Sequence, residues 1–209
     1  AYFLLNESID FLLKKQPVYA LKSVNAILSS MKLEGIASLP VLEDKQGKSN
    51  VTMLFTADKK NATLLTWTAF LMCFAALYFL TSWIPKLASI SGLSNELSIY
   101  SGILFNLGAF VGIITQGYLS AKFGLRKVIC FFLMATALLM VLFGFFTGSL
   151  LSLILFGIIG FGIQGGFIGL YSVAARIYSS EIRSTGIGWA IGFGRLGAII
   201  GPFVGGILI

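Results

Sequence analysis

Long apolar segments, each close to the length of a membrane-spanning helix, follow one another from residue 62 to the end of the chain. An α-helix needs about 20 apolar residues to cross the roughly 30 Å hydrocarbon core of a bilayer. Continuous apolar runs favour helices over a β-barrel, whose strands alternate apolar and polar positions. The pattern therefore predicts an all-α membrane protein, a polytopic bundle of five transmembrane helices. We expect these spans at about residues 62–84, 99–119, 128–146, 150–174 and 185–209.

The stretch before these spans is polar and rich in lysine. Apolar positions at helical spacing predict two short amphipathic helices, at residues 8–15 and 17–31, and then a loop over residues 39–50. Pro17 suits the start of the second helix, whereas we expect Pro85 to end the first span. A solvated linker is one interpretation of this stretch, and a segment that binds a lipid surface or a calmodulin-like partner is another. The expected domains are residues 1–60 and 61–209.

Composition supports the interpretation of the chain as a membrane protein. Charged residues make up 11% of the chain and hydrophobic residues 57%, whereas soluble domains carry about 25% charged residues. A net charge of +7 would suggest nucleic acid in a soluble protein, but no basic surface interleaved with aromatic residues is visible. We therefore expect a lipid bilayer and no nucleic acid as partner. The chain has no histidine, which excludes a histidine-based metal site.

Basic residues gather in two of the four connections between spans. They are Lys122, Arg126 and Lys127 in one connection and Arg176 and Arg183 in the other. The remaining two connections carry only Lys86. By the positive-inside rule, the basic connections and residues 6–60 lie on the cytoplasmic side. This alternation agrees with five spans.

Arg195 is the one charged residue between residues 184 and 209. A guanidinium stays protonated, and at the centre of a membrane helix it costs at least about 2.5–3.5 kcal/mol. Arg195 follows Arg183 by twelve residues, or about 18 Å of helix, which places it near the midplane. Gln164 lies at a matching depth in the fourth span, twelve residues before Arg176. We expect Arg195 to face a ligand site; alternatively it binds backbone carbonyls or Gln164 and locks the bundle.

Further candidates lie in other spans. Trp67, Phe74 and Tyr78 share helical spacing and either form a ligand wall or pack helices and lipid. Asn106 forms either a packing hydrogen bond or part of a cavity, and Tyr171 shares a helix face with Gln164. All eight acidic residues lie outside the predicted spans, so no carboxylate of this chain takes up a proton within the membrane. Nothing in the sequence forms a catalytic constellation, and we do not expect an enzyme.

Two stretches resemble a known family. The segment GYLSAKFGLRK (residues 117–127) resembles the Gly-x3-Asp-Arg/Lys-x-Gly-Arg/Lys-Arg/Lys loop of the major facilitator superfamily, although Ala121 replaces the acidic position and Leu125 a basic one. The stretch LYSVAARIYSSEIRSTGIGWAIGFGRLGAIIGPFVGGIL (residues 170–208) is similar to helices ten and eleven of the aromatic acid/proton symporters in that superfamily. Its most specific part is the run GWAIGFGRLGAIIGP. We assign to the loop, as gating residues, Gly117, Lys122, Gly124, Arg126 and Lys127.

The resemblance covers nearly the whole chain and implies a partial major facilitator fold. Residues 1–5 would end helix six, residues 6–60 would form the central cytoplasmic loop, and the five spans would be helices seven to eleven. The N-terminal half of the same protein and helix twelve would lie outside this chain, which would be truncated before the last helix. Members of this family import benzoate-like, hydroxybenzoate-like or muconate-like acids by proton symport and alternating access. The implied location is the bacterial inner membrane, with the proton as coupling ion and no other cofactor.

In such a carrier, Arg195 would bind the carboxylate of a small aromatic substrate. Gln164, Tyr171 and Asn106 would supply polar contacts, and Trp67, Phe74 and Tyr78 would wall in the aromatic ring. A major facilitator carrier of a sugar, a drug or another organic anion is the alternative, as is a membrane subunit that transports nothing.

Overall fold

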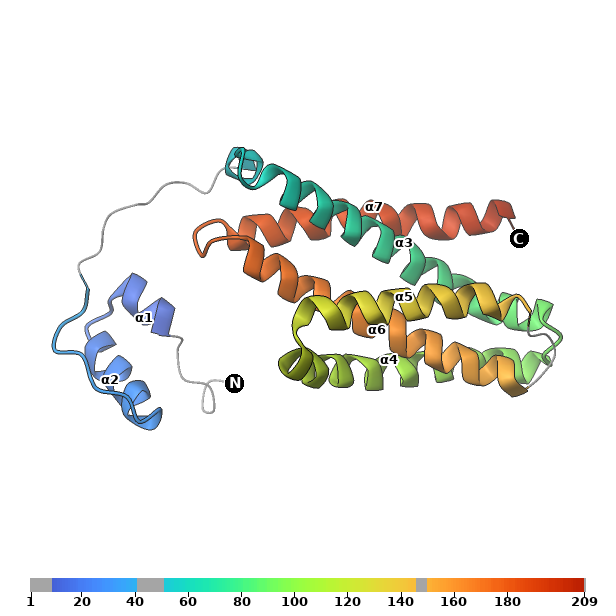
Figure 1. The fold of residues 1–209 in the computed structure, drawn as a ribbon, viewed down its shortest axis with the longest axis horizontal. Helices are drawn as coiled ribbons and strands as arrows, with labels where there is room; N and C mark the ends of the chain where they lie inside the picture. The colour runs from blue at the N-terminus through green and yellow to red at the C-terminus, as the bar shows by residue number, and fades with distance from the viewer. Residues whose placement is uncertain (1–8, 41–50, 146–149, 209) are drawn as a thin grey trace. The chain divides into compact units, whose positions relative to one another are not determined.

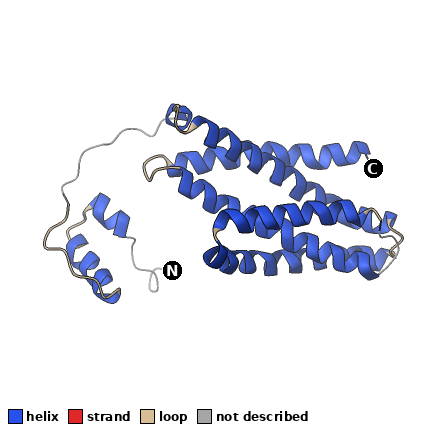
Figure 2. Ribbon diagram, viewed as in Figure 1, coloured by secondary structure: helices blue, strands red, loops and turns tan. Residues whose placement is uncertain are grey.

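The computed structural model describes residues 9–40, 51–145 and 150–208 (Figure 1). All regular elements within these ranges are helical (Figure 2). They are α1 (Ile9–Lys15), α2 (Ala20–Ser30), the 3-10 helix η1 (Val51–Phe55), α3 (Lys60–Ile90), α4 (Asn95–Phe123), α5 (Leu125–Phe143), α6 (Leu150–Ile177) and α7 (Arg183–Leu208). Helices α3 to α7 are the five helices of the described ranges that are long and apolar enough to cross a membrane. The prediction of an all-α membrane protein is confirmed.

The first span does not end at Pro85, and that expectation is wrong. Helix α3 continues through Pro85 to Ile90. A proline removes one hydrogen bond of the helix and tends to kink or break it. Here the neighbouring turns are held by packing, because Ile84 and Ala88, on either side of the proline, are both buried in the bundle core. The other four long helices occupy the predicted segments with ends that differ by a few residues.

Residues 9–40 form a unit with a small core of its own. Helices α1 and α2 correspond to the two predicted amphipathic helices, and Leu12, Ala20 and Val24 are buried between them. Helix α2 begins at Ala20 rather than at Pro17, whose carbonyl oxygen accepts a hydrogen bond from the Ala20 amide at 2.8 Å. Residues 1–5 and most of the predicted loop at 39–50 lie outside the described residues.

The boundary expected at residue 60 falls earlier in the structure. Helix η1 packs with the long helices, and its residue Leu54 is fully buried in their core. The hydroxyl of Thr63 in α3 donates a hydrogen bond to the Leu54 carbonyl oxygen at 2.9 Å. Residues 51–59 therefore belong to the bundle and not to the preceding unit.

The bundle is built from two closely packed helix pairs. Helix α3 packs most extensively on α7, and α4 on α6. A Cβ added at Gly201 would collide with the carbonyl oxygen of Ala75 in α3, and one added at Gly112 would collide with that of Phe161 in α6. Glycine thus allows backbone contact in both pairs, as small residues do between membrane helices. Helix α5 covers α4 and α6, and one of its faces remains exposed.

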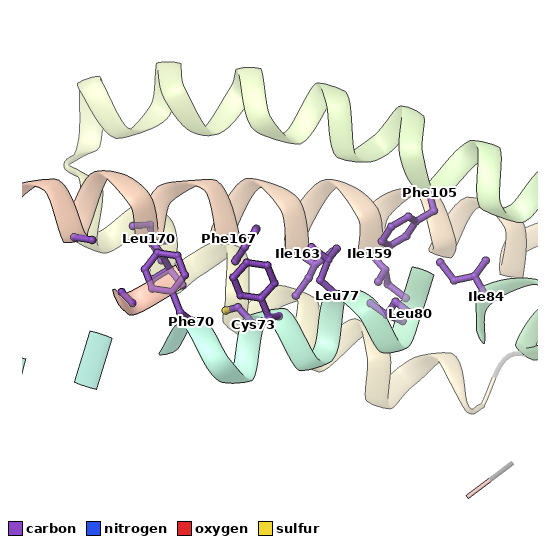
Figure 3. Close-up of a cluster of buried hydrophobic side chains, with 14 of the residues drawn as sticks. Phe70, Cys73, Leu77, Leu80, Ile84, Phe105, Ile159, Ile163, Phe167 and Leu170 are labelled. Atoms are coloured by element: carbon purple, nitrogen blue, oxygen red, sulfur yellow. The ribbon is translucent and has the colours of Figure 1, made fainter. Parts of the chain in front are cut away.

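The core between the two pairs lies where α3 faces α6. Figure 3 shows Phe70, Cys73 and Leu77 of α3 directed toward side chains of α6. Phe105 joins them from α4. This packing fixes the position of α3 between α6 and α7.

The start of α3, the α4–α5 junction and the α6–α7 connection lie at the same end of the bundle (Figure 1). We call this the basic end, because Lys122, Arg126, Lys127, Arg176 and Arg183 lie there. Gly124 forms the sharp α4–α5 junction with a φ of 92°, a conformation that suits glycine.

Candidate functional site

Arg195 lies in the middle of α7 and has its contacts in α3. Its Nη1 donates a hydrogen bond to the hydroxyl oxygen of Tyr78 at 3.0 Å. Its guanidinium carbon lies 5.3 Å from the centre of the Phe74 ring, within the range of a cation–π interaction. The side chain is otherwise exposed. A phenol and an aromatic face thus contact the guanidinium on one side, and several of its N–H groups stay available.

A cluster of aromatic rings extends from Phe74 into α6. The Phe74 and Phe167 rings meet edge to face, with their centres 4.8 Å apart. Tyr171 packs in the same way against Phe70 at 5.1 Å and against Phe167 at 5.4 Å. Helices α3, α6 and α7 thus bring one cation, two phenols and several apolar rings together near mid-helix.

The helix face that carries Arg195 has open space beside it. A Cβ added at Gly188 or Gly192 would meet no atom within 4 Å. Both glycines line an open groove of about 550 Å³ along α7, from Ser184 to Leu196, and Arg195 is not among the residues that line it. A ligand of the size of a small organic acid fits a space of this order.

Gln164 is not the partner of Arg195. It lies in α6 and is partly exposed, and within the described ranges no hydrogen bond joins it to Arg195. Helix α7 packs far more extensively on α3 than on α6. The sequence placed Gln164 at the right depth but could not show which neighbour α7 faces.

Trp67 belongs to a different aromatic cluster, nearer the basic end. Its ring stacks on Trp189 at 6.1 Å and on Phe193 at 5.2 Å, and Phe55 meets its edge at 5.5 Å. Its indole Nε1 is buried and has no hydrogen-bond partner among the described residues. Within the described ranges no hydrogen bond or cation–π contact joins Trp67 to Arg195. The structure therefore separates Trp67 from Phe74 and Tyr78, although the sequence grouped the three.

Asn106 also lies apart from the Arg195 contacts. It is exposed on α4, and its Nδ2 donates a hydrogen bond to the Gly102 carbonyl oxygen of the same helix at 2.8 Å. This hydrogen bond lies within α4 and does not link α4 to another helix.

The residues assigned to the gating loop cluster at the α4–α5 junction of the basic end. All five are exposed: Gly117, Lys122, Gly124, Arg126 and Lys127. The Lys122 ammonium lies 5.4 Å from the centre of the Phe123 ring. Their role in gating stays a prediction.

Sequence reasoning missed Gln116, an amide side chain that is 5% exposed in α4. Its Nε2 has no hydrogen-bond partner among the described residues and lies against Gly169 of α6. An amide inside an otherwise apolar run was the available signal. Trp189, the stacking partner of Trp67, was also missed, because nothing in the local pattern relates residues of α3 and α7.

Acidic residues and metal sites play no part in the geometry around Arg195. Glu96 in the first turn of α4 is the acidic residue found within helices α3 to α7. No group of three or more potential metal ligands occurs in the part of the chain that the structure describes. The arrangement can bind an anion through the exposed Arg195, and of the adjoining aromatic cluster the ring of Tyr171 is partly exposed.

Comparison with known proteins places this chain in a family. Residues 104–209 match the Major Facilitator Superfamily. The benzoate transport protein of Acinetobacter baylyi is 30% identical over 98% of this chain and 45% of its own length. The 4-hydroxybenzoate transporter PcaK of the same species is 31% identical over 99% of this chain and 47% of its own length. The gallate transporter of Pseudomonas putida is 29% identical over 100% and 47%.

The chain spans about half the length of these curated relatives, all of which are transporters. No solved structure is detectably similar to it. The match to the family, the similarity to aromatic acid transporters and the five apolar helices agree with the resemblance found in the sequence. The chain is a multi-pass membrane protein and belongs to the Major Facilitator Superfamily.

Proposed function

We propose that this chain forms the C-terminal half of a symporter that imports aromatic or related carboxylic acids with a proton. Benzoate, hydroxybenzoate and muconate represent the substrate class. The observation that carries the proposal is Arg195, an intramembrane cation whose described partners are the Tyr78 phenol and the Phe74 ring. Charged groups inside membranes are costly and commonly mark substrate or ion pathways.

The substrate's carboxylate completes the surroundings of Arg195. A guanidinium presents five N–H donors in a plane and can hold a carboxylate through two of them. The hydrogen bond to Tyr78 uses one donor. The partly exposed ring of Tyr171 offers apolar surface to the ring of the acid, and the buried rings of Phe74 and Phe167 support it from behind. Relatives named for benzoate, 4-hydroxybenzoate and gallate support this substrate class.

The proton requires a site elsewhere in the carrier. Helices α3 to α7 carry no acidic residue beyond the first turn of α4. We place the proton-binding carboxylates in an N-terminal half, which rocks against this half around a midplane site in the bacterial inner membrane. Residues 6–60 then lie on the cytoplasmic side, together with the basic end.

Uptake by the complete carrier in membrane vesicles tests the proposal. Labelled benzoate and 4-hydroxybenzoate should accumulate under an inward proton gradient and cease to accumulate when a protonophore removes it. Benzamide, which has the ring but no carboxylate, should not compete. Arg195→Ala should abolish saturable uptake, and Arg195→Lys should be poor because an ammonium lacks the planar fork. Arg176→Ala, which removes an exposed charge at the basic end, is the matched control.

Unchanged KM and maximal rate in Arg195→Ala would overturn the assignment of Arg195. Saturable, proton-dependent uptake of sugars or cationic drugs, without uptake of the acids, would instead establish the other substrate class. A complete carrier that moves none of these solutes would favour a membrane subunit without transport activity.

A further inference from the structure

The contact between Tyr78 and Arg195 links the two helices at the level of the proposed site. Tyr78 lies in α3 and Arg195 in α7, 117 residues apart, and their polar atoms are 3.0 Å apart. Tyr78 is half-buried, so its ring is fixed on one side while its hydroxyl faces the guanidinium. Phe74, one turn earlier on α3, stacks obliquely on the Tyr78 ring with 6.0 Å between their centres.

We propose that Tyr78 is a positioning residue, whose hydroxyl fixes the guanidinium of Arg195 for the carboxylate of the substrate. The inference rests on the proposed function. The positioning role differs from the role expected from the sequence, in which Tyr78 formed part of a wall around the aromatic ring of the substrate. In this arrangement, the substrate is held by Arg195, and Tyr78 acts on the substrate through Arg195.

Two contacts of different kinds restrain the guanidinium, one with the Phe74 ring and one with the Tyr78 hydroxyl. The Phe74 ring lies against it at 5.3 Å, which restrains its tilt. The Tyr78 hydroxyl accepts one N–H, which restrains its rotation in the plane. Since the guanidinium is a rigid fork, fixing one N–H also fixes the direction of the others. The remaining donors are then presented as a preformed pair, and less ordering accompanies the binding of a carboxylate.

The backbone around Arg195 supports the same geometry. A Cβ added at Gly194, the residue before Arg195, would lie 2.6 Å from an atom of the Phe74 ring. The α7 backbone therefore sits directly on Phe74 and can shift little toward or away from α3. With both backbones held, the orientation of Arg195 depends on side-chain contacts, of which the hydrogen bond to Tyr78 is the directional one.

Tyr171 cannot replace Tyr78 in this role. Within the described ranges no hydrogen bond joins it to Arg195, whose side-chain hydrogen bond goes to Tyr78. Its ring is held edge to face by Phe70 and Phe167. Tyr78 therefore gives the Arg195 guanidinium a directional contact that Tyr171 does not provide.

Tyr78→Phe in the complete carrier tests the inference, because it removes the hydroxyl and keeps the ring. Hydrogen bonds that involve a charged group contribute enough for the KM of benzoate uptake to rise roughly tenfold. The maximal rate should stay within about twofold, because the acid remains bound by Arg195 once it is in place. Tyr100→Phe, on an exposed tyrosine of α4, is the matched control and should leave both constants unchanged.

A double-mutant cycle separates positioning from direct contact with the substrate. In an Arg195→Lys background, Tyr78→Phe should add less than about twofold to KM, because a lysine ammonium has no planar fork to orient. A full tenfold effect in both backgrounds would mean that Tyr78 contacts the substrate itself, and the inference would be wrong. An unchanged KM in Tyr78→Phe would also overturn it.

The two proposals fail in different ways. Loss of uptake in Arg195→Ala together with a normal Tyr78→Phe carrier overturns the positioning role and leaves the proposed function standing. Normal uptake in Arg195→Ala overturns the proposed function and with it the role of Tyr78. Unfolding of the Tyr78→Phe protein is excluded as a cause by equal abundance and an equal thermal midpoint relative to Tyr100→Phe.

Discussion

The indole Nε1 of Trp83 in α3 donates a hydrogen bond to the carbonyl oxygen of Pro202 in α7 across 3.1 Å. The contact joins residues 119 positions apart, away from the basic end. The same indole nitrogen would be 2.6 Å from a Cβ added at Gly205, so the ring lies directly on the α7 backbone. Together with the Tyr78–Arg195 contact, it ties the two helices at a second level.

Trp83→Phe should weaken the packing of α3 on α7. The substitution keeps an aromatic ring and removes the N–H, and hydrogen bonds between membrane helices contribute about 0.6 kcal/mol on average and up to about 1.7 kcal/mol. We expect a loss of unfolding free energy of about that size, measured by denaturant titration in micelles. Trp189→Phe is the control, since that indole makes no hydrogen bond within the described ranges and is 48% exposed. An equal loss in both variants would show that the N–H of Trp83 contributes nothing.

Glycines of α7 should differ sharply in their tolerance of alanine. A Cβ at Gly201 would collide with the Ala75 backbone, and Gly201→Ala should destabilise the bundle by about 1–3 kcal/mol through overpacking. A Cβ at Gly188 would meet no atom within 4 Å. Gly188→Ala should therefore leave the free energy of unfolding unchanged or raise it by up to about 1 kcal/mol, the difference in helix propensity between the two residues. Unfolding free energies of both variants check this contrast, and similar values would contradict the close approach of α3 and α7.

The long helices could be predicted because each needs only local information. An apolar run of sufficient length is a membrane span wherever it packs, and counting from Arg183 placed Arg195 at mid-helix without knowledge of its neighbours. Pro85 was misjudged because the residues that carry the helix past it, Ile84 and Ala88, are stabilised by tertiary burial. Sequence patterns record the backbone cost of a proline but not the packing that offsets it.

The partners in the candidate site could be predicted only in part. Gln164 was matched to Arg195 because consecutive helices are usual neighbours, whereas α7 packs mainly on α3. Phe74 and Tyr78 were grouped on one helix face, and the structure brings both to Arg195, whereas their role in binding a ligand stays a prediction. The hydrogen bond of Tyr78 depends on how α3 and α7 face each other, which the spacing within either helix does not determine.

A chain of two hydrogen bonds should hold η1 against the bundle. The Tyr178 hydroxyl donates to Thr63 Oγ1 at 3.4 Å, and Thr63 Oγ1 donates to the Leu54 carbonyl oxygen at 2.9 Å. Thr63→Val removes both bonds and leaves a buried carbonyl without this donor, at a cost of about 1–3 kcal/mol. Tyr178→Phe removes only the longer bond and should cost less than about 1 kcal/mol.

Trypsin cleavage after Lys59 measures this effect directly, because Lys59 follows η1 and precedes α3. Cleavage of the native protein should be faster in Thr63→Val than in Tyr178→Phe. A reversed order, or no change in Thr63→Val, would contradict the anchoring of η1 through Thr63.

Asn25 should be the main polar contact that closes the unit formed by residues 9–40. Its Oδ1 accepts a hydrogen bond from the Ile36 amide at 2.8 Å, and its Nδ2 donates to the Ile36 carbonyl oxygen at 3.0 Å. Asn25→Ala removes both bonds and should release the segment around Ile36 from the small core. Asn25→Asp keeps the acceptor and loses the donor, so its effect should be intermediate. Hydrogen exchange of the Ile36 amide measures both effects.

We expect the exchange protection of Ile36 to fall roughly fivefold to a hundredfold in Asn25→Ala, which corresponds to about 1–3 kcal/mol for a lost buried contact. Ser29→Ala is the control, because that exposed hydroxyl bonds to the Ala26 carbonyl oxygen of its own helix at 2.8 Å. Protection of Ile36 should be unchanged there. If Asn25→Ala left the exchange of Ile36 unaltered, the apolar contacts of Ile36 with α2 would have to hold the segment without help, and the paired hydrogen bonds of Asn25 would be incidental to the fold of this unit.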